Sequence, residues 1–264
     1  NKLKTNQKQI KNKSKTNQNK MNFFKKYVYL LLPKIEELPK IEELPKIGID
    51  ILKSTENENL KTLFEVKVNI IKLIKLYQFS HMEHQRNGRL TADVGTSREK
   101  DLVAYMKYIL GDIVDYKIDN EKEEDVIVKS RKLSIKHSSV KTLSNASIKL
   151  HWTENKERQK KFIDSFVFKC DLIIVYVRLK DVTNGEIEVM YLNVERLNEL
   201  YDQFKYSEES VFKMRENSNG RGIEFSRFFF ETMKTNCEYH VKIKFSKINC
   251  YSLNCIERRI NYLV

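Results

Sequence analysis

Three polar residues in the stretch DVIVKSRKLSIKHSS, residues 125–139, have types and a spacing that could support phosphodiester hydrolysis. Asp125 precedes one short apolar run, and Ser134 and Lys136 lie in the next run. Side chains alternate along a strand, so Ser134 and Lys136 would share one face, and a tight hairpin would bring Asp125 beside them. A carboxylate can hold a divalent cation that acidifies water, while an ammonium orients the nucleophile and stabilises developing charge. The stretch therefore predicts a hydrolytic site on a β-hairpin.

The residues before this hairpin predict helices. Residues 96–111, TSREKDLVAYMKYILG, predict one helix because Thr96 and Glu99 match a capping box and apolar residues recur at helical spacing. Residues 57–78 predict an earlier helix from the same kind of pattern, and the polar residues 80–95 predict a loop between the two. The site would therefore follow a helical segment of the chain.

The residues from the hairpin onward predict a sheet with interleaved helices. The run 169–179, KCDLIIVYVRL, is apolar on both faces, as expected of a central strand, and Asn184-Gly185 predicts a tight turn after it. Further strands are expected over 125–130, 133–138, 147–152, 186–194 and 239–248, and helices over 153–166, 195–204 and 224–233. This order predicts an α/β fold with a mixed central β-sheet flanked by helices and an N-terminal helical extension.

The chain before residue 96 is expected to form two segments outside the main domain. Residues 1–20 carry seven lysines and no acidic residue, which predicts a disordered basic lead. Residues 21–95 would form an arm and a helical segment, and residues 96–264 the main domain. Proline recurs every sixth residue within PKIEELPKIEELPKIGID, which excludes an uninterrupted helix and favours one-turn pieces or an extended arm. Slippage duplication and a dimer-contact arm are the alternative explanations of this repeat.

Composition and charge limit the class of protein. The chain has 264 residues, 41% of them hydrophobic, which is enough to bury a sizeable core. Its formal charge of +13 and pI near 9.4 indicate an anionic partner such as nucleic acid or a membrane surface. Residues 1–20 supply seven of these charges, so the rest of the chain holds +6 (13 − 7). A compositional bias without function is the alternative.

The cysteines and the apolar runs exclude several other classes. The four cysteines lack CxxC spacing, so neither a zinc site nor a disulfide framework is expected, and a reducing cytoplasm is the predicted location. The run FFKKYVYLLLP, residues 23–33, is too short and too charged to span a bilayer, so we expect no membrane partner. The sequence also lacks the glycine loops of nucleotide-binding proteins and the HExxH and GxSxG motifs of hydrolases.

The arrangement of Asp125 and Lys136 resembles the PD-(D/E)XK nuclease superfamily, specifically its type II restriction endonucleases. That pattern has an Asp at the start of one strand and acidic-x-Lys on the next, matched here by Asp125 and by the tripeptide SIK that ends at Lys136. Ser134 stands where the superfamily usually has Glu or Asp, which removes one metal-binding carboxylate. Many members place an acidic residue on an upstream helix, and the resemblance suggests Glu99 for this role. Capping of its own helix is the alternative role of Glu99.

The resemblance covers roughly residues 96–245 and implies a fold, a reaction and partners. It implies a restriction-endonuclease-like fold, a homodimer on double-stranded DNA, and Mg²⁺-dependent hydrolysis by in-line attack of water on phosphorus. Asp125 and Glu99 would hold the metal, and Lys136 would orient or activate the water. Ser134 would either contact the metal shell or be a neighbour without a direct role.

Five further residues are predicted to contact DNA. His137 and Ser138 directly follow the lysine of the motif. Lys141 and Lys149 lie in a stretch rich in hydroxyls and amides that suits the phosphate backbone. Arg221 stands between two glycines and could read guanine through a bidentate hydrogen bond. The simpler alternatives are a satisfied strand histidine, a polar loop and an arginine in a loop.

Two rival functions fit the same residues. A repair or recombination nuclease of the same fold would share the site and would cut branched substrates or degrade DNA without discrete fragments. A non-catalytic nucleic-acid-binding protein would keep the basic surface without the acid that Ser134 replaces. Discrete fragments from a plasmid with Mg²⁺ would favour restriction over both rivals.

Overall fold

The computed structural model describes most of the chain after residue 45. The described residues are 46–86, 93–116, 124–138, 148–151, 155–181, 183–208, 210–214 and 222–248. Pro45–Val264 form one compact unit. The expected boundary at residue 96 therefore falls inside this unit. The basic lead and the two full copies of the PKIEEL repeat lie outside the described residues, whereas Lys46–Asp50 of the last, partial copy lie in strand β1 (Lys46–Lys53).

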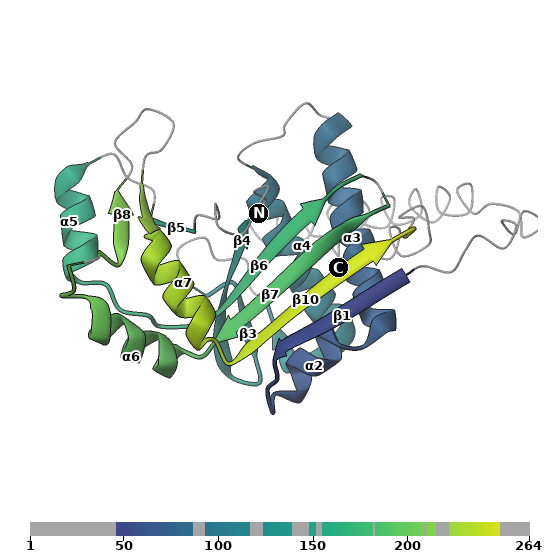
Figure 1. Cartoon of the computed structure of the whole chain (residues 1–264), viewed down its shortest axis with the longest axis horizontal. Helices are drawn as coiled ribbons and strands as arrows, with labels where there is room; N and C mark the ends of the chain where they lie inside the picture. Colours follow the sequence, from purple (N-terminus) through teal and green to yellow (C-terminus); the bar gives the residue numbers. More distant parts are fainter. Residues whose placement is uncertain are drawn as a thin grey trace, which may run out of the picture. The chain divides into compact units, whose positions relative to one another are not determined.

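A seven-stranded mixed sheet forms the centre of the unit, with the strand order β1-β10-β7-β6-β4-β3-β2 (Figure 1). Strands β4 and β6 run parallel, and the other neighbours run antiparallel. The strands are β1 (Lys46–Lys53), β2 (Val114–Asp115), β3 (Val126–Val128), β4 (Arg131–Ser138), β6 (Asp171–Leu179), β7 (Gly185–Leu192) and β10 (Tyr239–Ser246). The expected mixed central sheet is confirmed.

Helices α2, α3 and α4 pack against one face of this sheet, and a second group of elements packs against the other face at the end where β6 begins and β7 ends (Figure 1). One core joins the sheet to α2, α3 and α4, and a second core joins it to α6, α7 and a three-stranded sheet of order β5-β9-β8 (Figure 1). The remaining elements are α2 (Glu58–Phe64), α3 (Lys67–Arg86), α4 (Asp93–Leu110), a 3₁₀ turn (Gly111–Ile113), β5 (Lys149–His151), α5 (Lys156–Asp164), α6 (Val194–Phe204), β8 (Phe212–Met214), β9 (Ile223–Phe225) and α7 (Arg227–Asn236). In the described part of the chain, no helix combines the length and the apolarity that a bilayer span requires.

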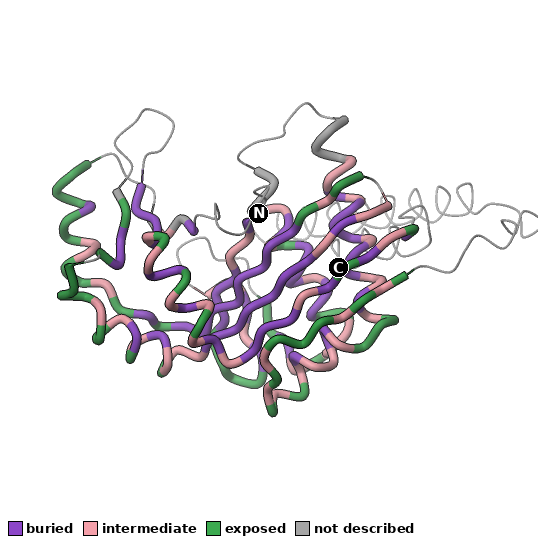
Figure 2. The backbone as a smooth tube through the Cα atoms, in the orientation of Figure 1, coloured by how far each residue is buried: buried purple, intermediate pink, exposed green. Residues whose placement is uncertain are grey.

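Strand β6 explains why the sheet is a buried layer. Ile173, Val175 and Val177 belong to the core under α2, α3 and α4, whereas Leu172 and Ile174 belong to the core with α6 and α7. Successive side chains point to opposite faces, so a strand covered on both sides must be apolar throughout. Figure 2 shows the central strands as the buried part of the unit. The expectation for residues 169–179 is confirmed.

The helices before the site differ from the sequence prediction. The single helix expected over residues 57–78 is two helices, because α2 ends at Phe64 and α3 begins at Lys67. The loop expected over 80–95 is wrong at its start, since α3 continues to Arg86. Where the loop was expected to begin, the helix is packed against the rest of the fold: Gln78 and Ser80 are each 1% exposed, and the Gln78 amide donates to the carbonyl of Ile248.

The predicted capping box at Thr96 and Glu99 is also wrong. Helix α4 begins at Asp93, so Thr96 lies inside the helix. An N-cap residue stands before the first helical residue, where its side chain accepts a hydrogen bond from the first turn. Capping therefore no longer explains Glu99.

Two other boundaries also differ from the sequence prediction. Strand β1 was not expected, and it pairs with β10 from Lys46 opposite Ser246 onward. The helix expected over 224–233 begins at Arg227, because Ser226 is its N-cap and accepts from the backbone N–H of Phe229 at 3.1 Å. The preceding residues form β9 instead.

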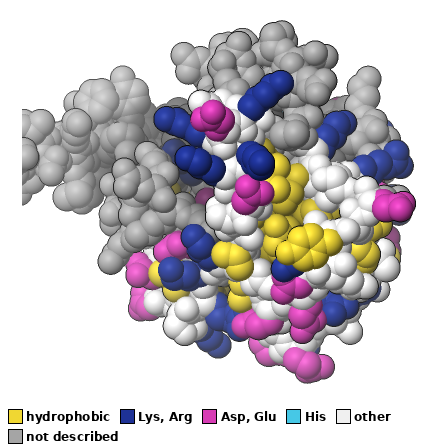
Figure 3. All heavy atoms as spheres, turned by 90° about the vertical axis from the view of Figure 1, so that its left-hand side faces the viewer, with side chains coloured by type: hydrophobic (Ala, Val, Ile, Leu, Met, Phe, Trp, Pro, Cys, Tyr) yellow, Lys and Arg dark blue, Asp and Glu magenta, His cyan; other side chains and the backbone are white. Residues whose placement is uncertain are grey.

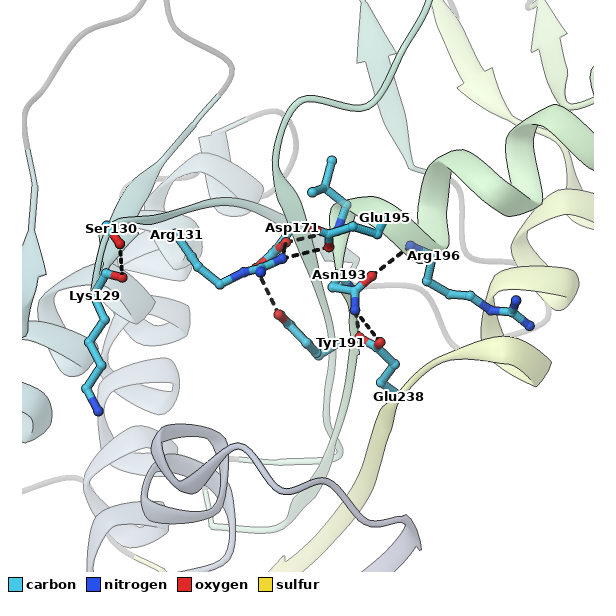
Figure 4. Close-up of polar contacts among 10 residues, drawn as sticks. Lys129, Ser130, Arg131, Asp171, Tyr191, Asn193, Glu195, Arg196 and Glu238 are labelled. Carbon is cyan, nitrogen blue, oxygen red and sulfur yellow. Dashed lines mark hydrogen bonds and ion pairs between the residues drawn. The ribbon is translucent and has the colours of Figure 1, made fainter.

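A buried carboxylate fixes the start of β4 beside β6 (Figure 4). Asp171 is 2% exposed and accepts two hydrogen bonds of 2.7 Å from the guanidinium of Arg131. It also accepts from the Tyr191 hydroxyl at 2.8 Å and from the Val194 backbone N–H at 2.9 Å. A buried charge is stable when hydrogen bonds satisfy its lone pairs, and these four do so. The cluster therefore supports the register of β4 on β6.

We expect Arg131→Met to lower the free energy of unfolding by about 2 kcal/mol, because it removes two charge-assisted hydrogen bonds from a buried carboxylate. Urea unfolding followed by circular dichroism measures this change. Lys132→Met is the matched control, since Lys132 pairs with Glu124 at 3.4 Å with half of its side chain exposed, and such pairs contribute little. An equal loss in both variants would contradict the role of Arg131.

Candidate active site

A tight hairpin places Asp125 beside β4, as the sequence predicts. Lys129 and Ser130 form its turn with φ of 46° and 67°, the left-handed conformation that matches the twist of paired strands. Strand β3 then pairs with β4 up to Val126 opposite Leu133. The backbone N–H of Asp125 donates to the Leu133 carbonyl at 2.8 Å. Asp125 therefore lies at the point where β3 stops covering the edge of β4.

Beyond this point, two carboxylates take the place of a strand along the edge of β4. The Oδ2 atom of Asp125 accepts from the Ile135 backbone N–H at 2.5 Å and from the Ser134 hydroxyl at 3.3 Å. The Glu99 carboxylate accepts from the backbone N–H of His137. Alternate N–H groups of a strand point to the same side, so residues 135 and 137 hold the two acids side by side. The edge of β4 is thus the frame of the site.

Lys136 completes the group of charged residues. Its Nζ lies 3.8 Å from Oδ2 of Asp125, and the two side chains are 26% and 30% exposed. The charges of both residues also act on Glu99, which comes from α4. The structure therefore brings Asp125, Lys136 and Glu99 together from three elements that the sequence separates.

Glu99 has a perturbed protonation equilibrium. Burial raises its pKa above the ordinary value, and the negative charge of Asp125 raises it further. Lys136 and the N–H of His137 act in the opposite direction without cancelling the shift. Two carboxylates held close together in a half-buried position favour a proton or a cation between them.

The residues present fit a magnesium ion. Mg²⁺ prefers oxygen ligands and is usually bound through one or two carboxylates together with water and substrate phosphates. Asp125 and Glu99 provide two carboxylates, and burial together with the charge of Asp125 makes the ionised form of Glu99 costly without a cation. Among the described residues, no group of three or more acidic, histidine or cysteine side chains has the arrangement of a complete metal cage. The donors therefore suit a site completed by water and substrate.

A comparison of families identifies the class of protein. The sequence model described as restriction endonuclease ThaI matches residues 61–263, more than half of the chain. The chain belongs to the ThaI restriction endonuclease family. As a member of that family, it is a type II restriction endonuclease, a site-specific deoxyribonuclease that binds DNA.

A solved structure supports the fold of this ThaI-family enzyme. It is described as a restriction endonuclease in complex with substrate DNA and is 23% identical in sequence, with a TM-score of 0.58. The similarity covers 77% of this chain and 98% of that chain. At this identity, the likeness shows a restriction-endonuclease fold. No curated protein matches the sequence of the ThaI-family enzyme.

The ring of His137 contacts Tyr77 of α3. It lies edge-on to the ring of Tyr77 with centroids 5.3 Å apart, and Nε2 lies 3.2 Å from the Tyr77 hydroxyl. Burial lowers the pKa of His137 well below its ordinary value, and the charge of Arg98 lowers it further, which favours the neutral ring. The Nε2 atom of this partly buried ring is therefore engaged within the fold. Alternation turns His137 to the face opposite Lys136, which favours the alternative of a strand histidine bonded within the fold, and its contact with DNA stays a prediction.

Two of the other four predicted DNA-contact residues, Ser138 and Lys149, lie in described strands of the ThaI-family enzyme. Ser138 is 6% exposed at the end of β4, so burial argues against its predicted contact. Lys149 lies in β5 opposite Glu224. Lys141 and Arg221 fall outside the described residues.

Four residues behind the site were missed by the sequence prediction. They are Tyr77 and Ser80 of α3 and Arg98 and Asp101 of α4, and each is at most 2% exposed. Their signal was present, because Arg98 and Asp101 lie three residues apart in a helix whose other inner residues are apolar. A periodicity argument alone assigns charged residues to the solvent face. It would therefore place Arg98 and Asp101 in solvent, whereas the fold buries both.

Proposed function

We propose that this ThaI-family enzyme hydrolyses double-stranded DNA by the PD-(D/E)XK mechanism with Mg²⁺, using Asp125, Glu99 and Lys136. The observation that carries the proposal is the meeting of two carboxylates and an ammonium at the edge of β4. This is the combination that in-line attack on a phosphodiester requires, because both the phosphate charge and the nucleophile must be controlled.

Each side chain has a distinct proposed role. Asp125 and Glu99 would hold Mg²⁺, which when bound would neutralise phosphate charge and increase the acidity of water. Lys136 would orient the attacking water and stabilise negative charge that develops on phosphorus oxygens. Ser134 is 6% exposed and would act through Asp125, since its hydroxyl donates to Oδ2 at 3.3 Å. The chain thereby replaces the usual second acid of the motif with an acid from α4.

The partners follow from the substrate. The two strands of a DNA duplex are related by two-fold symmetry, so a homodimer would place one active site on each strand. Basic side chains gather on the face that carries α5 (Figure 3), where Lys156, Arg158, Lys160 and Lys161 are exposed beside the acids Glu157 and Asp164. Such cations suit the phosphate backbone.

Further proposals concern specificity and location. Lys141, Lys149 and Arg221 stay as proposed DNA contacts. Cys170 and Cys237 are free thiols, which supports the proposed cytoplasmic location.

Plasmid digestion tests the proposed function. The purified protein should yield discrete fragments with Mg²⁺ and none with a chelator, and mapping of the fragment ends would define the recognition sequence. Binding without cutting in Mg²⁺ would contradict the catalytic proposal. Selective cutting of branched DNA would favour a repair nuclease of the same fold.

We expect Glu99→Gln to lower the cleavage rate by about 10²-fold, since it removes one proposed metal-binding charge and keeps an oxygen that can accept from the His137 N–H. The same variant should unfold at a higher temperature at pH 7. A carboxyl whose pKa is raised by folding destabilises the fold once it is ionised, and Gln removes this cost.

The pH dependence of cleavage provides a second measurement on Glu99. Because its pKa is raised, cleavage by the wild type should fall with decreasing pH earlier than an ordinary glutamate would allow, and more Mg²⁺ should move the fall to lower pH. Lys100→Gln is the matched control, since Lys100 is the exposed neighbour on α4. Wild-type cleavage by Glu99→Gln would exclude Glu99 from the site.

A further inference from the structure

A polar cluster is buried between the helices and β4, directly behind the proposed site. Its members are Tyr77, Ser80, Arg98, Asp101 and His137. The first four are 0%, 1%, 2% and 1% exposed, in that order. Polar and charged side chains are rarely this buried without a specific reason.

Contacts within the polar cluster join three elements. The hydroxyl of Tyr77 on α3 bonds Nε2 of His137 on β4 at 3.2 Å. The Ser80 hydroxyl donates to the Asp101 carboxylate, which links α3 to α4. Arg98 interacts electrostatically with Tyr77, Asp101 and His137. The relative placement of α3, α4 and β4 is therefore specified by polar contacts as well as by apolar packing.

The members of the polar cluster are chain neighbours of the reacting groups. Arg98 directly precedes Glu99 on α4, and His137 directly follows Lys136 on β4. The backbone N–H of His137 also donates to Glu99. A rotation of β4 at residue 137 would therefore move the N–H that holds Glu99 and the side chain of Lys136 together.

Stability alone does not account for these residues. Replacing a buried ionic group by apolar residues of similar volume is often neutral or stabilising, so burying Arg98 and Asp101 is an inefficient way to strengthen a core. What the Tyr77–His137 and Ser80–Asp101 hydrogen bonds provide is a defined geometry, because hydrogen bonds are directional whereas apolar contacts are not. Groups that surround metal and catalytic ligands commonly use this property, and their loss costs about 10- to 100-fold in metal affinity or activity.

We propose that Tyr77 and His137 are positioning residues, whose contact fixes β4 against α3 so that Glu99 stays at the His137 N–H beside Lys136 and Asp125. The inference rests on the proposed function of these three residues. It assigns no contact with substrate or metal to Tyr77 or His137. The proposed role of Tyr77 and His137 is to align Glu99, the acid proposed to replace the Glu or Asp that the superfamily usually has at the position of Ser134.

The test compares two buried tyrosines that lose the same group. Tyr77→Phe removes the hydroxyl that bonds His137, and Tyr105→Phe removes a hydroxyl that donates to the Leu63 carbonyl at 2.5 Å in the same core. Both tyrosines are at most 1% exposed, so both variants should lose a similar amount of thermal stability. Only Tyr77→Phe alters a contact with β4.

Two readouts separate positioning from stability. The first is the Mg²⁺ concentration for half-maximal plasmid cleavage, which should rise about 10-fold for Tyr77→Phe and stay unchanged for Tyr105→Phe. The second is Mn²⁺ binding to the DNA-free protein, measured by the electron paramagnetic resonance of the free ion, which should weaken about 10-fold for Tyr77→Phe alone. His137→Phe should reproduce both effects, and the double variant should be no worse than either single variant, because both remove one contact.

The outcomes distinguish failure of the positioning role of Tyr77 and His137 from failure of the proposed nuclease function. Equal behaviour of Tyr77→Phe and Tyr105→Phe in both readouts would overturn the positioning role and leave the proposed function intact. Additive effects of Tyr77→Phe and His137→Phe would also overturn it, since the two residues would then act separately. Unchanged cleavage by Asp125→Asn would instead overturn the proposed function on which the inference rests.

Discussion

Asp125→Asn is expected to lower plasmid cleavage by about 10³-fold or more. The amide keeps an oxygen that can accept from the Ile135 backbone N–H, so the hairpin geometry should survive. What disappears is the negative charge that lies 3.8 Å from Lys136 and that would hold the metal. The loss should therefore be one of rate rather than of fold.

Initial rates of supercoiled plasmid loss at saturating Mg²⁺ measure the effect of Asp125→Asn. Glu124→Gln is the matched control, because Glu124 is the preceding acid in the chain and pairs with Lys132 at 3.4 Å instead. This control should keep wild-type rates, and both variants should unfold within a few degrees of the wild type. Cleavage by Asp125→Asn at a tenth of the wild-type rate or faster would remove Asp125 from the catalytic group.

Lys136→Met should lower cleavage by about 10²- to 10³-fold. Methionine keeps the apolar stem on β4 and removes the ammonium, so the loss isolates the charge from the packing. The positive charge of Lys136 also lowers the pKa of Glu99 against the effect of burial. Residual cleavage by the variant should therefore fall at a higher pH than cleavage by the wild type, because Glu99 is then protonated more readily.

Lys132→Met is the control for Lys136→Met. Lys132 lies on the same strand and, by alternation, on the same face, but its partner is Glu124. Its loss should leave both the rate and the pH profile unchanged. A pH profile that stays at its wild-type position in Lys136→Met would show that the ammonium does not act on Glu99.

The core of the site follows from local rules that a sequence displays. The alternation of apolar and polar residues in β4 separates Lys136 from Ile135, and a two-residue turn at Lys129 and Ser130 returns the chain beside Asp125. Both features depend on residues close together in the chain. For this reason, the amino-acid pattern alone predicts that Asp125 and Lys136 meet.

The position of Glu99 could not be predicted from residues close to it in the chain. A capping box gave a local explanation for this residue, and helix α4 overturned it by beginning at Asp93. The distance from Glu99 to β4 depends on how α4 packs on the sheet, and packing is decided by the whole core. Its hydrogen bond with the His137 N–H exists because β3 stops at Val126 and leaves the edge of β4 open.

The class of fold, the hairpin and the residues most suited to the chemistry are encoded locally, because turn residues, apolar alternation and residue types act over short stretches of chain. Three other features depend on the packed fold. Strand β1 pairs with β10 and becomes an edge strand of the sheet, His137 contacts Tyr77, and Arg98 and Asp101 are buried. These outcomes depend on contacts between residues far apart in the chain. Their free energy comes from burial and directional hydrogen bonds that form only when the elements pack together.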